Sequence, residues 1–185
     1  CPDFASGCAV ASDHELSIDC YAFVLYGTTY YYLCSDIDGF IFDRHCGVSN
    51  LTEAPLHLSL ILKQAYRSMQ VSKIKNTEVS FFKDIGLYYA ALAIDDLDVL
   101  YQAERLLSPL QDEDIRSTFR LYLEYNGSVQ ATAQALFLHR NTVNYRIQKA
   151  RRLLHTYSAE KELEYLFSFY LCDCLKLKEQ DLLTP

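Results

Sequence analysis

Short runs of hydrophobic residues, separated by turn residues, dominate the first part of the chain. β-Branched and aromatic residues gather at 21–26, 29–34 and 39–43, with Gly27 and an aspartate-rich stretch between them. Such residues favour strands, whereas glycine and aspartate favour turns. The pattern predicts a small antiparallel meander built from these three runs, and one more strand at 78–82.

From residue 54 onward the hydrophobic positions follow a helical spacing. Apolar residues recur every three or four positions from Leu58 to Met69. This spacing predicts a helix over 54–71, with Pro55 in its first turn, where the missing N–H of proline costs little.

Beyond the last expected strand the pattern is helical nearly to the end of the chain. Asp84 is expected to cap a helix that runs through Ala93, and Asp96 is expected to cap one that runs through Leu107. Polar and acidic residues replace the apolar pattern between residues 108 and 114. A domain boundary is therefore expected there.

The C-terminal part is predicted to hold four helices from Ile115 onward. Gly127 can take the left-handed conformation that ends the first helix, and Ser128 can cap the second. A tight turn at 137–139 then leads to a third helix over 140–154. A short helix, a tight turn and a longer helix form the arrangement that places its second helix in the major groove of DNA.

The helix over 140–154 has two chemically distinct faces on a helical wheel. One face is apolar and is expected to be buried; it holds Val143, Ile147, Ala150 and Leu154. The opposite face and its flanks are rich in hydrogen-bond donors; they hold Asn141, Asn144, Tyr145, Arg146, Gln148, Lys149 and Arg152. Arginine, asparagine and glutamine pair with base edges, and a helix N-terminus favours phosphate. The polar face therefore predicts a surface that reads DNA.

The charge of the chain supports this interpretation only when its distribution is considered. The chain carries 17 basic and 24 acidic residues, a net charge of −7, which by itself argues against a nucleic-acid partner. Residues 126–155, however, contain five lysines and arginines and no acidic residue. The rest of the chain then has 12 basic and 24 acidic residues, a balance of −12. A local basic field matters more than total charge for docking on phosphates.

A family resemblance adds to these observations. The stretch NGSVQATAQALFLHRNTVNYRIQKARRLL, residues 126–154, closely resembles the C-terminal helix-turn-helix of the PucR/CdaR family of bacterial transcription regulators. The HRNT-x-x-YR signature of that family falls on His139, Arg140, Asn141, Thr142, Tyr145 and Arg146. The resemblance implies a cytoplasmic, sequence-specific regulator whose partner is double-stranded DNA.

Roles can be assigned to the residues of the expected recognition helix. Arg140, Asn141 and Asn144 lie at or near its N-terminal end, where side chains usually meet base edges. The other residues that match the signature are assigned to phosphate positioning: Thr142, Tyr145 and Arg146. Gln148, Lys149 and Arg152 complete the expected DNA-binding set. His139 is expected either to contact phosphate or to pack beside Phe137.

The resemblance also implies a domain organisation. Residues 46–49 and the helix after them resemble the end of the degenerate GGDEF-like domain that precedes the helix-turn-helix in CdaR-type members. The expected fold is an α+β region with a small antiparallel sheet over 1–110, which is a partial or degenerate GGDEF-like remnant. An all-α helix-turn-helix domain over 111–185 follows it. The chain lacks a Gly-Gly-acid-acid-Phe signature, so the resemblance implies no cyclase activity.

The ends of the sequence suggest a fragment. The chain begins at Cys1 and its one methionine is Met69, so we expect it to be part of a longer regulator. A small-molecule effector is expected to be sensed by a region that this fragment lacks.

Other classes of function have weaker support. The seven cysteines are odd in number and irregular in spacing, so we interpret them as reduced cytosolic thiols rather than disulfides or zinc ligands. The five histidines are scattered, and the carboxylate pairs sit at expected helix caps and linkers, so no enzyme, cofactor or metal site is expected. No segment is long and apolar enough to cross a membrane. The open alternative is a dimerisation or protein-interaction module that does not bind DNA.

A homodimer is the expected working form. One recognition helix reads only a few base pairs, too few to find a site among ~10⁶ genomic competitors. Helix-turn-helix proteins commonly solve this by two-fold pairing. The strand-rich N-terminal region and a final helix over 159–178, which carries a wide apolar band, are expected to supply the contact.

Overall fold

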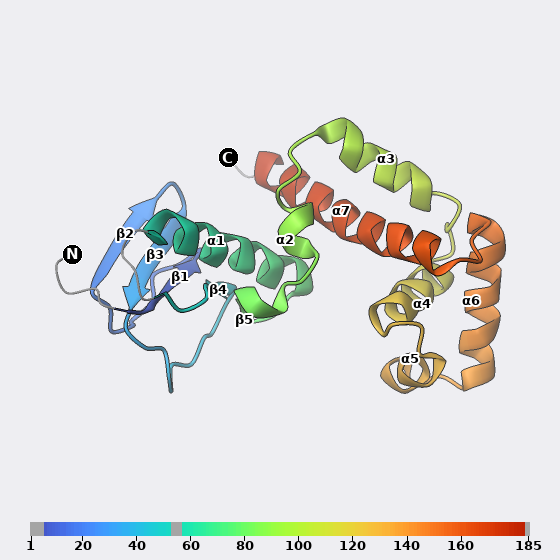
Figure 1. Cartoon of the computed structure of the whole chain (residues 1–185), viewed down its shortest axis with the longest axis horizontal. Coiled ribbons are helices and arrows are strands. Elements are labelled where there is room, and N and C mark those ends of the chain that lie inside the picture. The colour runs from blue at the N-terminus through green and yellow to red at the C-terminus, as the bar shows by residue number, and fades with distance from the viewer. Residues whose placement is uncertain (1–5, 53–56, 184–185) are drawn as a thin grey trace. The chain divides into compact units, whose positions relative to one another are not determined.

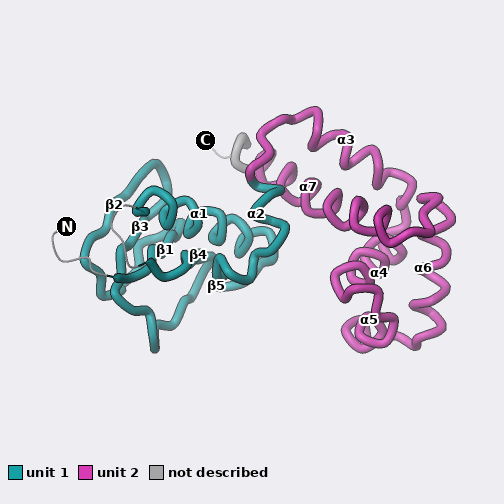
Figure 2. The backbone as a smooth tube through the Cα atoms, viewed as in Figure 1, with its two compact units in different colours: residues 1–92 teal, residues 93–185 magenta. Residues whose placement is uncertain are grey.

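The computed structural model describes residues 6–52 and 57–183 (Figure 1). The chain divides into two compact units, residues 1–92 and 93–185 (Figure 2). The sequence places residues 93–110 with the N-terminal part, but helix α3 (Leu97–Leu107) lies in the second unit. It does so because α3 packs extensively along α7 (Ala159–Leu183). The relation of the first unit to a GGDEF-like domain stays a prediction.

The first unit contains a five-stranded mixed sheet with the order β2-β3-β1-β4-β5. Its strands are β1 (Cys8–Ser12), β2 (Ala22–Tyr26), β3 (Thr29–Cys34), β4 (Cys46–Val48) and β5 (Val79–Phe81). The β2–β3 hairpin and β5 lie where the sequence predicts strands. The expected antiparallel meander is wrong, because β1 is inserted between β3 and β4, and β5 pairs with β4 in parallel.

Several segments differ from the strands expected near the N-terminus. Residues 39–43 form no strand; Phe42 is instead buried in the core on one face of the sheet, with Phe40 packed against it, their ring centroids 4.9 Å apart. The missed strands are β4, which has three residues, and β1, which is central and buried at all five positions. Its sequence, CAVAS, has a single β-branched residue, so the strand signal is weak.

Helix α1 (Leu58–Lys75) covers the other face of the sheet. The sequence predicted this helix over 54–71, and Ala54 and Pro55 lie outside the described residues. Small side chains on the sheet let the helix approach closely; the cluster they share is Ala9, Ala11, Ile61, Ala65 and Met69. α1 therefore seals one face of the sheet, while loop residues seal the opposite one.

The segment after β5 is less regular than the sequence predicts. A short 3₁₀ turn, η2 (Phe82–Asp84), precedes the four-residue helix α2 (Tyr88–Ala91). The expected helix capped by Asp84 is wrong, because Asp84 lies inside η2 and Gly86 takes a positive φ of 54°. This left-handed glycine prevents η2 and α2 from joining into one continuous helix.

The second unit consists of α3, α4 (Glu113–Glu124), α5 (Val129–Leu136), α6 (Arg140–Leu154) and α7. The four helices expected after the boundary are all present. The expected caps are confirmed at α3 and α5: the side chain of Asp96 accepts from the Asp98 N–H, and that of Ser128 from the Ala131 N–H. Together the helices bury a set of large side chains that includes Leu100, Leu107, Phe119, Ile147, Tyr165 and Phe169.

Gly47 provides a test of the close approach between β4 and α1. A Cβ at this position would lie 2.0 Å from the backbone nitrogen of Met69 and 2.1 Å from the backbone oxygen of Ala65. Because backbone atoms cannot yield as a side chain can, Gly47→Ala should lower the free energy of unfolding by about 3 kcal/mol or more. The control is Gly39→Ala. A Cβ there meets no atom within 4 Å, but Gly39 has a φ of 78°, so the free energy of unfolding should fall by about 1–2 kcal/mol. Urea unfolding would contradict this if Gly47→Ala were the milder change.

The buried thiols predict a loss of stability at alkaline pH. Burial raises the pKa of Cys34 and Cys174 from 9.0 to about 12, and that of Cys46 to about 11. Between pH 9 and 11 the unfolded chain therefore releases protons that the folded chain keeps, so the free energy of unfolding should fall as pH rises. Urea titrations across this range should show a negative slope that Cys34→Ala makes shallower. An identical slope in the variant would refute the role of this thiol.

Candidate nucleic-acid interface

The turn between α5 and α6 is held by backbone and side-chain hydrogen bonds. Phe137 ends α5 in the left-handed conformation, and the Leu138 N–H donates to the Ala133 carbonyl at 3.0 Å. His139 is the N-cap of α6, because its Nδ1 accepts from the Asn141 N–H at 3.2 Å. The sequence identified the tight turn but not this cap, since histidine is not among the residues preferred at that position.

The apolar face of α6 is buried as predicted. Val143, Ile147, Ala150 and Leu154 are all at most 6% exposed, and α6 packs against α4 and α5. α6 spans Arg140–Leu154, the range expected for the recognition helix. Its rotation about its own axis is therefore fixed by this stripe, and the polar residues must face outward.

The outward face of α6 carries most of the predicted DNA-binding residues. The exposed members of the set are Arg140, Asn141, Thr142, Tyr145, Gln148, Lys149 and Arg152, and Asn144 is half-buried at their side. Every one of them can donate a hydrogen bond. One helix thus gathers eight of the nine predicted residues on or beside a single outward surface.

Arg146 is the predicted site residue that lies elsewhere. Its guanidinium forms an ion pair with the Asp114 carboxylate and donates to the Thr118 hydroxyl at 3.2 Å; both partners belong to α4. The side chain is only 20% exposed. Arg146 thus links the middle of α6 to the beginning of α4.

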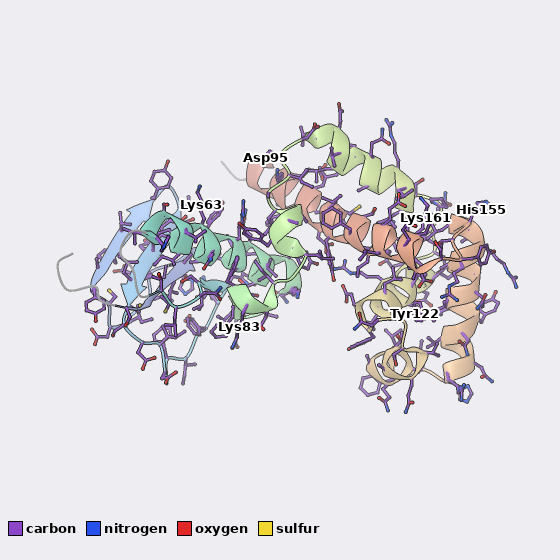
Figure 3. The ribbon with its side chains drawn as sticks, viewed as in Figure 1. Lys63, Lys83, Asp95, Tyr122, His155 and Lys161 are labelled. Atoms are coloured by element: carbon purple, nitrogen blue, oxygen red, sulfur yellow. The ribbon has the colours of Figure 1, made fainter. Side chains whose placement is uncertain are left out.

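A second arginine of α6, which the sequence did not single out, has a similar role. Arg151 donates to the Glu162 carboxylate of α7 at 2.6 Å and to the Tyr122 hydroxyl of α4 at 2.9 Å. Tyr122 lies on α4, and His155 ends α6 just beyond this arginine (Figure 3). Arg151 therefore fixes the C-terminal end of α6 to two other helices.

The other basic side chains of residues 126–155, the segment without acidic residues, point to solvent. Arg140 and Arg152 are exposed and form no ion pair among the described residues. Lys149 is exposed too, and its Nζ stays 4.0 Å from the Asp112 carboxylate, a distance that gives only a weak interaction in water. Two of the five basic side chains are thus used inside the fold, and three are left to act outward.

The cysteines, the possible metal ligands and the long helices bear on other kinds of site. The six described cysteines are free thiols, and Cys1 lies outside the described residues. Within residues 6–52 and 57–183, no three His, Cys, Asp or Glu side chains come together as metal ligands would. No described helix has the length and apolar character that crossing a membrane requires.

Comparisons with known proteins agree with this geometry. Residues 115–162, which run from α4 into α7, match the family model of the PucR C-terminal helix-turn-helix domain. The chain is 29% identical over 115 residues to the purine catabolism regulatory protein of Bacillus subtilis (strain 168), an alignment that covers 58% of this chain and 22% of that protein. It is 38% identical over 55 residues to the uncharacterized protein YxkF of the same strain, covering 30% of this chain and 18% of that protein.

A solved structure aligns with most of the chain at low similarity. The crystal structure of a regulator of polyketide synthase expression from Bifidobacterium adolescentis aligns with 95% of this chain and 80% of its own, at 18% identity and a TM-score of 0.38. The chain spans about a fifth of the length of the curated relatives that it matches. Over residues 115–162 the chain carries the C-terminal helix-turn-helix domain of the PucR family.

Proposed function

We propose that this chain is the DNA-binding part of a sequence-specific transcription regulator, with α6 in the major groove of double-stranded DNA. The observation that carries the proposal is the outward face of α6, where exposed donors are gathered without a carboxylate. The match of residues 115–162 to a helix-turn-helix domain supports it. A duplex offers acceptors at its phosphates and base edges, which this face complements.

The residues of α6 then divide into three roles. Arg140, Asn141 and Asn144, near the N-terminal end, are proposed to meet base edges. The rest of the outward face is proposed to position the helix on phosphates and on the groove wall; it comprises Thr142, Tyr145, Gln148, Lys149 and Arg152. Arg146 is proposed to act as a positioning residue, because a phosphate contact would require its pair with Asp114 to open.

The alternative is a module that uses the same helices to bind protein and does not bind DNA. A protein-binding helix face usually presents a larger apolar patch, whereas the outward face of α6 is almost entirely polar. We favour DNA for this reason. The proposal further includes a cytoplasmic location, no catalytic role, and an effector that binds to a region outside this chain.

A homodimer is proposed as the working form. Strand β2 lies at one edge of the sheet, and its residues Phe23, Val24, Leu25 and Tyr26 are each at least half exposed. The strand, AFVLY, has no charged residue or proline, the devices that commonly protect a free edge from pairing. An antiparallel pair of β2 strands from two copies would satisfy the two-fold symmetry of most dimers.

Selection from a random pool of duplex DNA tests this function. The chain should enrich one motif that contains two half-sites, spaced about 34 Å or a multiple of it, because two recognition helices read it together. Light scattering should then give the mass of a dimer. Recovery of unenriched sequences would count against DNA reading, and a monomer that protects one unrepeated site would count against the homodimer.

Substitutions on the selected operator separate the three roles. Arg140→Ala or Asn144→Ala should relax the preference at one or two base pairs and cost about 1–3 kcal/mol of binding free energy. Arg152→Ala should weaken binding to all sequences alike. It should also reduce the slope of the logarithm of the binding constant against the logarithm of salt concentration by about one. Arg146→Ala should also leave base preference unchanged but should lower the thermal stability, which Arg152→Ala should not. Arg105→Ala, an exposed arginine of α3, is the matched control.

These assignments can fail in distinct ways. A changed base preference in Arg146→Ala would mean that this side chain reaches the bases. An unchanged preference in both Arg140→Ala and Asn144→Ala would place the reading residues elsewhere on α6.

A further inference from the structure

Phe137 occupies a position that the stability of the fold does not explain. It ends α5 with φ 54° and ψ 37°, and its side chain is 96% exposed. The left-handed region disfavours residues with a Cβ, and glycine or asparagine usually accept it. Elsewhere in the described chain, Asn76, Asn126 and His155 take this conformation. An aromatic side chain here has an unfavourable backbone conformation and gains no burial, a combination that points to a contact outside the chain.

The ring of Phe137 stands beside a hollow in the helix-turn-helix. This hollow has a volume of about 730 Å³ and is lined by Val129, Gln130, Ala133, Gln134, Phe137, Leu138 and Arg140. α5 supplies four of these residues, and Arg140 is the first residue of α6. The hollow therefore adjoins the end of the recognition helix that is proposed to meet base edges.

The chemistry around the hollow indicates what it would receive. Gln130, Gln134 and Arg140 supply donors at its border, while Val129, Ala133 and Phe137 supply apolar surface. Residues 126–155 contain no acidic side chain, so this segment presents no carboxylate to a negatively charged occupant. In the major groove, an A·T pair presents acceptors together with the thymine 5-methyl group, and phenylalanine is among the side chains that contact this methyl.

We infer that Phe137 is a specificity-determining residue whose ring contacts the 5-methyl group of a thymine next to the bases reached by Arg140. The inference rests on the proposed DNA-binding function and adds a residue that lies outside α6. The turn before the recognition helix then selects an A·T pair, in addition to the pairs selected by the helix. Its left-handed backbone holds the ring clear of the protein, where a groove floor can meet it.

Replacing thymine by deoxyuridine tests this contact, because it removes only the methyl group. Wild-type chain should bind its selected operator about fourfold less tightly when the critical thymine is replaced, which is the effect of leaving about one methyl group unburied. Phe137→Gly should bind the thymine operator at least about fourfold less tightly and should not distinguish thymine from uracil at that position. Tyr157→Ala is the matched control, since Tyr157 is 73% exposed in the loop after α6 and lies outside the hollow.

Phe137→Gly is suited to this test because glycine tolerates the left-handed conformation, so its urea midpoint should equal or exceed that of the wild type. Equal operator affinity in wild type and Phe137→Gly would overturn the inference. The exposed ring would then be assigned to a contact with a protein. A thymine-to-uracil effect that persists in Phe137→Gly would also overturn it. The proposed function is judged separately, because its failure would appear as absence of any enriched operator for the wild-type chain.

Discussion

The burial of one stripe of α6 is the constraint on which the rest of the second unit depends. Val143, Ile147, Ala150 and Leu154 recur at intervals of four, three and four, so they form a line along the helix and fit against α4 and α5. Once this line is buried, no freedom remains to choose which side chains face outward. The polar surface is thus a geometric result of the apolar one, and its donors need no partners inside the protein to hold their place.

Two arginines add a second level of order to the same helix. Arg146 joins α6 to α4 near the middle, and Arg151 joins it to α7 and α4 at the C-terminal end. Ion pairs of this kind are directional, so they fix the position of the helix along its axis, which apolar contacts alone define less sharply. Arginines on this one helix therefore either hold the fold together or face outward toward a partner. Only the burial of each side chain and its hydrogen-bond partners distinguish the two roles.

Local patterns were sufficient where a local cause determines the structure. The bounds of α6, the caps at Asp96 and Ser128 and the β2–β3 hairpin all follow from neighbours in the sequence; in the hairpin, Gly27 has the positive φ of 60° that a two-residue turn requires. Features with distant causes were missed. β1 is a strand because β3 and β4 flank it, although its small residues carry little strand signal.

The same distinction applies to the site. Exposure of the polar face followed from periodicity, so most of the predicted DNA-binding residues could be named in advance. The inward turn of Arg146 could not, because its partner Asp114 is 32 residues away and no spacing rule relates the two. The sequence identifies Phe137 only as part of a turn, because the pattern of hydrophobic positions predicts neither its left-handed backbone nor the exposure of its side chain.

The division of the basic side chains has a consequence for ionic strength. Lys149 and Arg152 face solvent and are proposed to lie on phosphates, where a bound duplex would exchange its counterions for them; two such contacts would give a salt slope of about −1.8 for each recognition helix. Arg146 and Arg151 are at most about a quarter exposed and hydrogen-bonded, so dissolved ions screen them much less. Concentrated salt should therefore release the nucleic acid long before it loosens the helices, and elution from a charged column would return a folded domain.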